Sequence, residues 1–281
     1  MTAQIRRARD AGVCYGVERA LKLAHEAANE AGQAYTLGPL IHNPRVVAEL
    51  EAKGVAVTDD PQQLSAHDTL IIRTHGVEAA RIAQAQARGI KVIDATCPYV
   101  RKVQQAVRTL SAEGYQIIII GEPDHPEVIA VRSHADAGAL VISSPEDIPA
   151  DFCARKAGVV VQTTQTLEVL RAVVAALTER CQELRVYNTI CDATSKRQEA
   201  AREVARDSEV MIVVGGQNSG NTTRLAEISR EAGARTYHIE RPEELSGEWF
   251  SGVRRIGVTA GASTPAEHLD SVVARIRELV R

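Results

Sequence analysis

The sequence is poor in aromatic residues and has no long apolar run. Of its 281 residues, one is tryptophan and two are phenylalanine, so the aromatic surfaces on which nucleotide bases stack are scarce. The formal net charge is −3 with both signs interspersed, which leaves no basic face for nucleic acid or for an anionic membrane. A membrane-spanning run of roughly eighteen apolar residues is absent, and so is an apolar signal core. We therefore expect a soluble cytoplasmic protein without nucleic-acid or membrane partners.

The cysteines are few, odd in number and widely spaced. Five cysteines in a long chain argue against a disulfide framework and favour a reducing compartment. No C-x-x-C pair is present, although structural zinc sites usually contain such pairs. The sequence also lacks a flavin or nicotinamide fingerprint, so any redox chemistry needs an external electron donor.

Three of the cysteines begin a threefold pattern. A polar residue follows each of them after 28 positions, and a second polar residue follows near the end of a predicted strand. The three sets are Cys14, His42 and His75; Cys97, His125 and Thr163; and Cys191, Ser219 and Ser263. A base also lies five positions after each cysteine: Arg19, Lys102 and Lys196. The pattern predicts one supersecondary unit used three times.

Three thiols at matching places favour an iron–sulfur cluster. A single cysteine in such a chain is usually a small buried side chain. Iron–sulfur clusters are normally closed by four thiolates, so three of them leave one iron open to a ligand. The remaining two, Cys153 and Cys181, fall outside the pattern and are interpreted as ordinary core or surface residues.

Short apolar runs alternate with helical patterns along the chain. Runs such as Ile117–Ile120 are continuous, as in parallel strands that are covered on both faces. This alternation predicts an α/β protein with mainly parallel sheets. Strands are predicted at 35–38, 69–74, 91–95, 115–121, 158–162, 185–190, 209–215 and 254–259. Three units of similar size are expected, at 1–97, 98–190 and 191–281.

Helix-start signals lie beside several of the polar residues. Asn43-Pro44, Pro126 and Thr264-Pro265 resemble a first helical turn and adjoin His42, His125 and Ser263. Strand ends that lead into helices are the usual ligand sites of α/β proteins, and helix N-termini favour anions. The pattern therefore predicts a phosphate-bearing ligand held by these side chains.

Glu127 is a candidate proton donor. It lies two residues after His125, and burial near a cluster would raise its pKa. The alternative is a glutamate that only complements a helix dipole, and the sequence does not separate the two.

The segment Gly215–Thr222 has the glycine spacing of a P-loop and follows a predicted strand. Asn221 occupies the position of the essential lysine, however. We interpret the segment as a loop that binds a phosphate through Ser219, Asn221 and backbone N–H groups, and not as part of a nucleoside triphosphatase.

Nine ordered motifs together resemble the 4-hydroxy-3-methylbut-2-enyl diphosphate reductases, and they span essentially the whole chain. They are GVCYGVERA, IHNPRVV, RTHGV, DATCPYV, DHPEV, VQTT, ICDATSKRQEA, QNSGNTTRL and TAGAS. The resemblance implies a trefoil-like arrangement of three pseudo-repeated α/β units around a central [4Fe–4S] cluster. It also implies the last step of the methylerythritol phosphate route to isoprenoids. In that step the C4 hydroxyl is lost in a two-electron reduction that gives isopentenyl and dimethylallyl diphosphates.

The resemblance also implies roles for individual residues. Cys14, Cys97 and Cys191 would ligate the cluster, and Glu127 would deliver protons with Thr163 and His125. The substrate would be held by His42, His75, His125, Thr163, Ser219, Gly220, Asn221 and Ser263. Ferredoxin or flavodoxin would supply the electrons. Three positions depart from the usual motif: Gly220 stands where serine is frequent, Asp124 where glycine is, and Tyr15 where alanine is. They put loop geometry and affinity in question, and not the activity.

Two other functions stay open at this point. A redox-neutral hydro-lyase could use the same open iron, and it would turn over without a reductant. A non-catalytic phosphate-binding or zinc-stabilised protein would be colourless and would bind its ligand without the thiols.

Overall fold

The structure is a computed structural model that describes residues 3–30 and 33–281. Its contacts divide the chain into two compact units. The first unit contains Met1–Val17, His42–Arg45 and Asp192–Arg281, and the second contains Glu18–Ile41 and Val46–Cys191. Over the described residues, no helix combines the length and apolarity that a membrane span requires.

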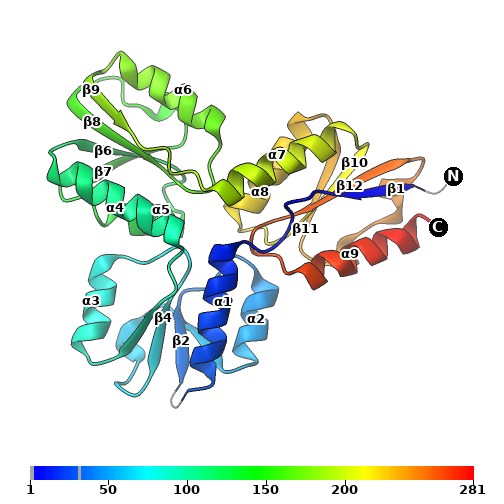
Figure 1. Cartoon of the computed structure of the whole chain (residues 1–281), viewed down its shortest axis with the longest axis horizontal. Coiled ribbons are helices and arrows are strands. Elements are labelled where there is room, and N and C mark those ends of the chain that lie inside the picture. Colours follow the sequence, from blue (N-terminus) through cyan, green and yellow to red (C-terminus); the bar gives the residue numbers. More distant parts are fainter. Residues whose placement is uncertain (1–2, 31–32) are drawn as a thin grey trace. The chain divides into compact units, whose positions relative to one another are not determined.

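The first unit is a parallel sheet covered by helices on both faces (Figure 1). Its strand order is β1 (Gln4–Arg7), β12 (Arg255–Ala260), β10 (Val210–Val214) and β11 (Arg235–Ile239), and every pairing is parallel. The helices are α7 (Asp192–Arg206), α8 (Gly220–Glu231) and α9 (Ala266–Leu279).

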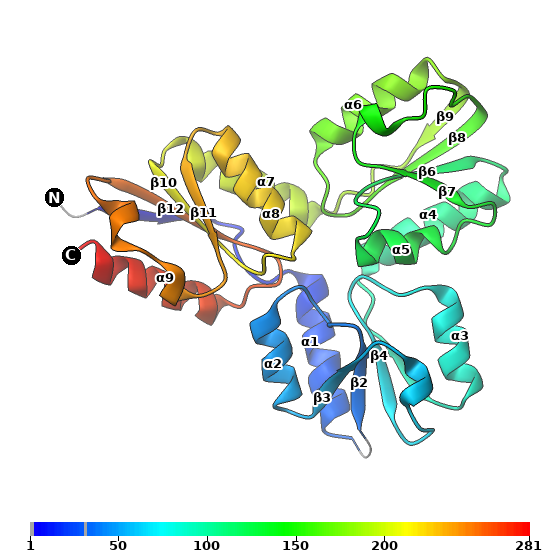
Figure 2. The same cartoon turned by 180° about the vertical axis from the view of Figure 1, so that it is seen from behind.

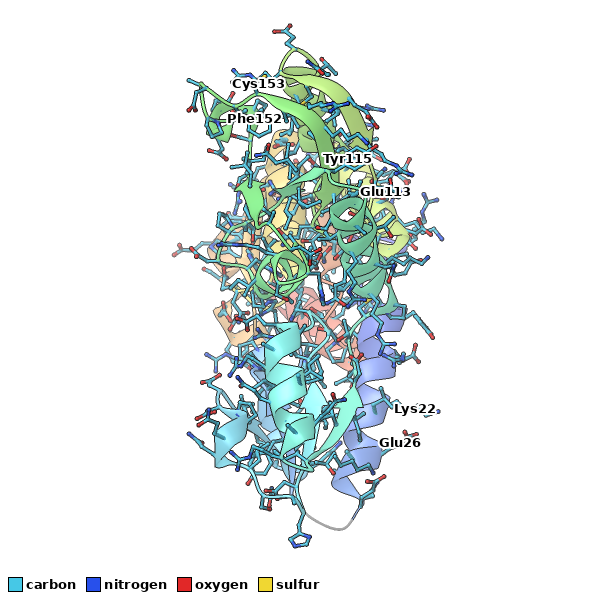
Figure 3. All side chains as sticks on the ribbon, turned by 90° about the vertical axis from the view of Figure 1, so that its left-hand side faces the viewer. Lys22, Glu26, Glu113, Tyr115, Phe152 and Cys153 are labelled. Atoms are coloured by element: carbon cyan, nitrogen blue, oxygen red, sulfur yellow. The ribbon has the colours of Figure 1, made fainter. Side chains whose placement is uncertain are left out.

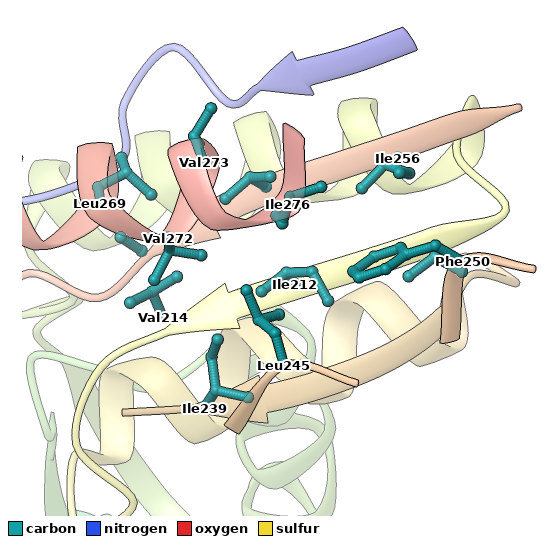
Figure 4. Close-up of a cluster of buried hydrophobic side chains, with 13 residues drawn as sticks. Ile212, Val214, Ile239, Leu245, Phe250, Ile256, Leu269, Val272, Val273 and Ile276 are labelled. Atoms are coloured by element: carbon teal, nitrogen blue, oxygen red, sulfur yellow. The ribbon is translucent and has the colours of Figure 1, made fainter. Parts of the chain in front are cut away.

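The central strand β10 shows why the sheet needs helices on both faces. Its side chains alternate, so Ile212 and Val214 pack with α9 (Figure 4). Met211 and Val213 point the other way, toward α7 and α8. A side chain at Gly257 on β12 would place its Cβ 2.2 Å from the Met211 sulfur, so glycine lets α7 approach the sheet. Burial of each large apolar side chain stabilises the fold by about 1.5–3 kcal/mol.

The second unit contains two further four-stranded parallel sheets, seen from both sides in Figures 1 and 2. One has the order β3 (Val55–Thr58), β2 (Ala34–Leu37), β4 (Thr69–Ile72) and β5 (Lys91–Asp94). The other has the order β7 (Ala139–Ile142), β6 (Gln116–Ile120), β8 (Ala154–Val161) and β9 (Cys181–Val186). The helices are α1 (Tyr15–Ala28), α2 (Pro44–Glu51), α3 (Ala79–Ala87), α4 (Pro98–Ala112), α5 (Pro126–Arg132) and α6 (Leu167–Thr178). Helices α1 and α2 begin with residues of the first unit.

The apolar run in β6 is explained by burial on both faces. Ile117 and Ile119 pack with α4 and α5, whereas Ile118 and Ile120 pack with α6. This pattern is typical of a central parallel strand. The predicted α/β class with parallel sheets is confirmed, and all eight predicted strands overlap an observed strand.

Two predictions differ from the observed strands. We expected a strand at 185–190, but β9 ends at Val186, because it is a polar edge strand and the chain then leaves the sheet toward Cys191. The units expected at 1–97 and 191–281 also do not match the observed sheets at β1. This strand lies in the first of these ranges, but it pairs with β12 of the last range and not with the sheet of β2. The division into three units otherwise stays a prediction.

Candidate active site

The three cysteines of the repeat occupy the same place in the three sheets. Each follows an edge strand: Cys14 follows β1, Cys97 follows β5 and Cys191 follows β9. Their backbone N–H groups donate to carbonyls that follow the neighbouring strand: Ala262 (3.1 Å), Thr74 (2.9 Å) and Thr163 (3.1 Å), respectively. All three side chains are partly exposed. The repeat found in the sequence therefore corresponds to the same local structure at the edge of each of the three sheets.

The polar residues of the repeat also take equivalent places. The strand beside each cysteine's own strand is β12, β4 or β8, and it precedes Ser263, His75 or Thr163. The third strand of each sheet is β10, β2 or β6, and it precedes Ser219, His42 or His125. Each sheet thus offers a thiol and two polar side chains at the carboxyl ends of three adjacent strands, where α/β sheets bind their ligands.

Buried or half-buried guanidinium groups hold two of the cysteine loops. In the first unit Arg197 is 7% exposed and donates twice to the Gly12 carbonyl, at 2.6 and 3.1 Å. Gly12 has a φ of +99°, which favours glycine at this turn two residues before Cys14. In the second unit Arg19 donates to the carbonyls of Thr96 (3.3 Å) and Asp94 (3.1 Å), just before Cys97.

The sequence pattern identified only one of these two arginines. Arg19 was among the predicted bases, but in the third repeat Lys196 is exposed and its neighbour Arg197 is the buried one. The third base, Lys102, lies over the Tyr99 ring with its Nζ 5.1 Å from the ring centroid. Helical spacing, which turns successive side chains by 100°, was the signal available to separate Lys196 from Arg197.

In the first unit two hydrogen bonds join the loop of His42 and Asn43 to the loop of Ser263. The Ser263 hydroxyl donates to the His42 carbonyl at 3.1 Å. The Asn43 amide donates in return to the Ser263 carbonyl at 2.8 Å. Gly216 lies against the same place, since a Cβ there would lie 2.6 Å from the His42 carbonyl oxygen. Sequence reasoning treated Asn43 only as a helix-start signal, whereas the structure gives it a role in joining two loops.

The segment interpreted as a phosphate loop ends in a helix. Ser219 caps α8, and its hydroxyl accepts from the Thr222 N–H at 3.3 Å. Gly220 and Asn221 therefore form the first turn of the helix and are not loop residues. The Asn221 side chain is 5% exposed, and neither its oxygen nor its nitrogen has a hydrogen-bond partner among the described residues. A buried amide in this state costs free energy unless a ligand satisfies it.

Asn221→Leu is expected to weaken ligand binding and to stabilise the protein in the absence of ligand. Leucine has a similar size and removes the unsatisfied amide, so the free energy of unfolding should rise by about 1 kcal/mol. Affinity for the anionic ligand should fall at least about tenfold, which corresponds to about 1.4 kcal/mol. Thermal unfolding of the apoprotein with and without inorganic pyrophosphate measures both effects.

Thr259→Val is the matched control for this substitution. The Thr259 hydroxyl is also buried without a partner among the described residues, but it lies within strand β12. Its removal should stabilise the protein and leave the pyrophosphate-induced shift unchanged. An equal shift in the Asn221 variant and in the wild type would contradict a ligand contact at Asn221.

In the second unit Glu127 and Thr163 form a tight buried pair. The Glu127 side chain is 2% exposed. Its Oε1 accepts from the Thr163 N–H at 2.6 Å, and its Oε2 accepts from the Thr163 hydroxyl at 2.7 Å. The Thr163 carbonyl also accepts from the Cys191 N–H, so one residue connects the carboxyl group with a cysteine of the repeat.

Burial raises the pKa of Glu127 from its ordinary value of 4.5 to about 7. The two hydrogen bonds from Thr163 act in the opposite direction, and the nearby charge of Glu122 adds a smaller upward effect. A carboxyl group with a pKa near 7 holds a proton at neutral pH and can release it, as a general acid requires.

The imidazole of His125 is fixed by the backbone beside Glu127. Its Nδ1 accepts from the Glu127 N–H at 3.1 Å, so in the neutral ring the proton lies on Nε2. The His75 ring meets the His125 ring edge to face, with the centroids 5.5 Å apart and the planes at 85°. The structure thus brings His75, His125, Glu127 and Thr163 together in the second unit.

The comparisons with known proteins cover nearly the whole chain. The profile of the LytB protein family matches residues 5–277. The 4-hydroxy-3-methylbut-2-enyl diphosphate reductase of Geobacter sulfurreducens is 48% identical over 271 residues, which is 96% of each chain. The enzyme of the same name from Citrifermentans bemidjiense is also 48% identical and covers 97% of this chain and 96% of its own.

Two solved structures of reductases with related names also match this chain. One is (E)-4-hydroxy-3-methyl-but-2-enyl diphosphate reductase, the terminal enzyme of the non-mevalonate pathway, with 45% identity and a TM-score of 0.73. It covers 99% of this chain and 100% of its own. The other is the E-1-hydroxy-2-methyl-but-2-enyl-4-diphosphate reductase of Plasmodium falciparum, with 26% identity and a TM-score of 0.93 over 98% of this chain and 88% of its own. The chain therefore belongs to the LytB protein family.

Proposed function

We propose that this chain catalyses the reductive dehydroxylation of (E)-4-hydroxy-3-methylbut-2-enyl diphosphate in isoprenoid biosynthesis. Two electrons and two protons convert the allylic alcohol into isopentenyl or dimethylallyl diphosphate and water. The observation that carries the proposal is the equivalent placement of Cys14, Cys97 and Cys191 after the edge strands of three matching sheets. It is supported by family membership and by 48% identity to named reductases.

The cofactor is a [4Fe–4S] cluster, and the donor set fits it. Three partly exposed thiols, each with its backbone N–H anchored to an equivalent carbonyl, are suited to hold three irons and leave the fourth open. We assign Cys14, Cys97 and Cys191 as the ligands. When bound, the cluster supplies the electrons and a Lewis-acidic iron for the substrate hydroxyl.

In this proposal the diphosphate is held by polar side chains that follow the ends of the strands. In the first unit Asn221 offers a buried amide without a hydrogen-bond partner among the described residues, and Ser219 and Gly220 precede it at the start of α8. His42 and Ser263 are hydrogen-bonded to each other in the same unit. In the second unit His75 and His125 offer ring N–H groups, which bind phosphate oxygens well. Fixing the phosphates also orients the allylic group, which lowers the entropic part of the barrier.

In this proposal Glu127 supplies the proton that turns the departing hydroxyl into water, and the second proton of the reaction is taken up by the allyl carbon. In the structure the Thr163 hydroxyl donates to Glu127 Oε2, 2.7 Å away. When Glu127 is protonated, this hydrogen bond would reverse, so that Oε2 donates to the Thr163 hydroxyl and the hydroxyl donates its own proton to the departing oxygen. The Thr163 N–H holds Oε1 at 2.6 Å, so the proton is directed to one oxygen. His125 fixes the backbone of Glu127 through its Nδ1 and keeps its Nε2 proton for the substrate. We place the enzyme in the cytoplasm, because a reducing compartment keeps cysteine ligands as thiols.

The test is turnover of the diphosphate by protein purified without oxygen. We expect about four irons and four sulfides per chain. With reduced methyl viologen, the protein should convert the allylic alcohol into the two isoprenoid diphosphates, identified by chromatography. Consumption of the substrate at the same rate without a reductant would instead indicate a hydro-lyase. Protein that cannot be loaded with iron would contradict the proposal entirely.

A further inference from the structure

A groove in the second unit adjoins the loop that carries Cys97. It lies between α3 and α4, has a volume of about 560 Å³ and includes Thr96 and Pro98, the two neighbours of Cys97, in its wall. Apolar side chains such as Val77 and Ile82 form another part of the wall. Figure 1 shows α3 beside the sheet that contains β4 and α4 beside the sheet that contains β6. An occupant of this groove therefore contacts the two residues that flank Cys97, one of the proposed cluster ligands.

The groove is strongly basic, although the chain as a whole carries a net charge of −3. Its wall contains three cations of α4, Arg101, Lys102 and Arg108, and neither α3 nor α4 contains an acidic residue. Among the described residues that line the groove, Asp94 is the single carboxylate, and Arg101 pairs with it at 2.7 Å. The remaining positive charges are therefore available to a partner.

Lys102 and Arg108 carry most of this available charge. Both side chains are exposed, and neither forms an ion pair with any residue the structure describes. Lys102 is oriented over the Tyr99 ring, and the Arg108 Nε donates to the His134 Nδ1 at 3.3 Å. Burial lowers the pKa of His134, and the Arg108 charge lowers it further, so this histidine stays neutral and accepts the bond. The two cations are thus held in place without being neutralised.

The geometry points to this groove as the docking site of an acidic one-electron carrier protein. This inference rests on the proposed function, because that reaction consumes two electrons per substrate and the sequence has no flavin or nicotinamide fingerprint. Two carrier molecules would each bind, give up one electron and leave oxidised, and together they would supply the two electrons of the reaction. The groove places such a carrier against Thr96 and Pro98, the two sequence neighbours of the proposed cluster ligand Cys97. Positive charge around an apolar centre suits a fast, salt-sensitive encounter with an acidic partner.

The experiment reverses the two charges with Lys102→Glu and Arg108→Glu in the cluster-loaded enzyme. The matched control is Lys22→Glu with Arg171→Glu, which makes the same change in net charge at two exposed cations on α1 and α6. Lys22 projects outward beside Glu26 on α1 (Figure 3). The probe is a small acidic ferredoxin. Its affinity in the oxidised form is measured by calorimetry without substrate, and its KM in the reduced form is measured in turnover.

We expect the Lys102/Arg108 variant to bind ferredoxin at least about tenfold more weakly and to show a weaker salt dependence. Its KM for the diphosphate and its turnover with methyl viologen, a small cationic reductant, should stay within about twofold of the wild type. Unchanged ferredoxin affinity would overturn the inference, and so would an equal loss in the control variant. A higher KM for the diphosphate with unchanged ferredoxin affinity would show that the groove attracts substrate instead. Because ferredoxin binding is measured without substrate, its outcome is separate from turnover with methyl viologen, which tests the proposed function.

Discussion

Glu127→Gln is expected to lower turnover by at least about two orders of magnitude, the effect of losing a general acid. Glutamine reproduces the neutral acid in shape and bonding. Its carbonyl oxygen can accept from the Thr163 N–H, and its amide can donate to the Thr163 hydroxyl, which keeps both contacts of the pair. The amide has no proton to release at neutral pH, however. Cluster content and substrate affinity should therefore be retained while the chemical step is lost.

The dependence of kcat on pH in the wild-type enzyme should reveal the ionisation of Glu127. Burial raises the pKa of Glu127 to about 7, so below that pH the side chain is the acid that the reaction needs. Above pH 7 the carboxylate predominates, and kcat should fall tenfold for each further pH unit as the protonated fraction falls. A profile of kcat between pH 6 and 9, with reduced methyl viologen in excess, measures this limb.

Glu122→Gln is the control that separates charge from proton donation. The negative charge of Glu122 contributes to the raised pKa of Glu127. Its removal should shift the alkaline limb to lower pH without lowering the plateau of kcat. Turnover close to that of the wild type in Glu127→Gln, or an alkaline limb that stays in place in Glu122→Gln, would argue that the proton comes from another group.

The raised pKa also predicts a stability effect with a definite sign. An unfolded glutamate ionises near 4.5, whereas the folded one holds its proton until about pH 7. The unfolded state therefore releases a proton that the folded state keeps, and the group destabilises the fold progressively as the pH rises between these two values. Glutamine carries no such penalty. Above pH 7 the Glu127→Gln variant should be at least as stable as the wild type in chemical unfolding.

Much of the site was predictable because its chemistry is periodic in the sequence. The cysteines recur before equivalent polar residues, and the buried strands β6 and β10 are continuous apolar runs. Strands such as β1, β3, β7 and β11 were not predicted, because they lie at sheet edges and carry a weaker apolar signal. The partner of β1 is β12, about 250 residues away in the sequence, and no local pattern encodes such a pairing.

The less predictable part of the site consists of contacts made through the backbone. Among the described residues, Arg197 donates to the carbonyl groups of Gly12 and Ala193. Every residue has a backbone carbonyl, so a sequence does not indicate which of them will accept such a bond. The same holds for His125, whose Nδ1 accepts from a backbone N–H and whose tautomer follows from that bond. Sequence patterns therefore predict polar side chains at strand ends better than side chains that hold the neighbouring loops through backbone contacts.

Cys97→Ser is expected to abolish a stable cluster, whereas Cys153→Ser keeps it. Cys97 caps α4 and is partly exposed, and its N–H is anchored to Thr74. Serine keeps that backbone anchor but replaces a soft thiolate by a hydroxyl that binds iron–sulfur clusters poorly. Anaerobic reconstitution should give about four irons per chain for the wild type and for Cys153→Ser, and well under one for Cys97→Ser.

Thermal unfolding shows separately whether each variant is folded. Its reference values are those of the apo and the cluster-loaded wild type, which we expect to differ. Metal that binds only the folded state adds its binding free energy to folding. Cys97→Ser should therefore unfold at the temperature of the apo wild type and show no stabilisation after reconstitution. Cys153 is exposed and lies outside the repeat, so its serine variant should show the full stabilisation. Equal iron content in the two variants would contradict the ligand assignment, because it would mean that Cys97, which follows β5, does not hold the metal.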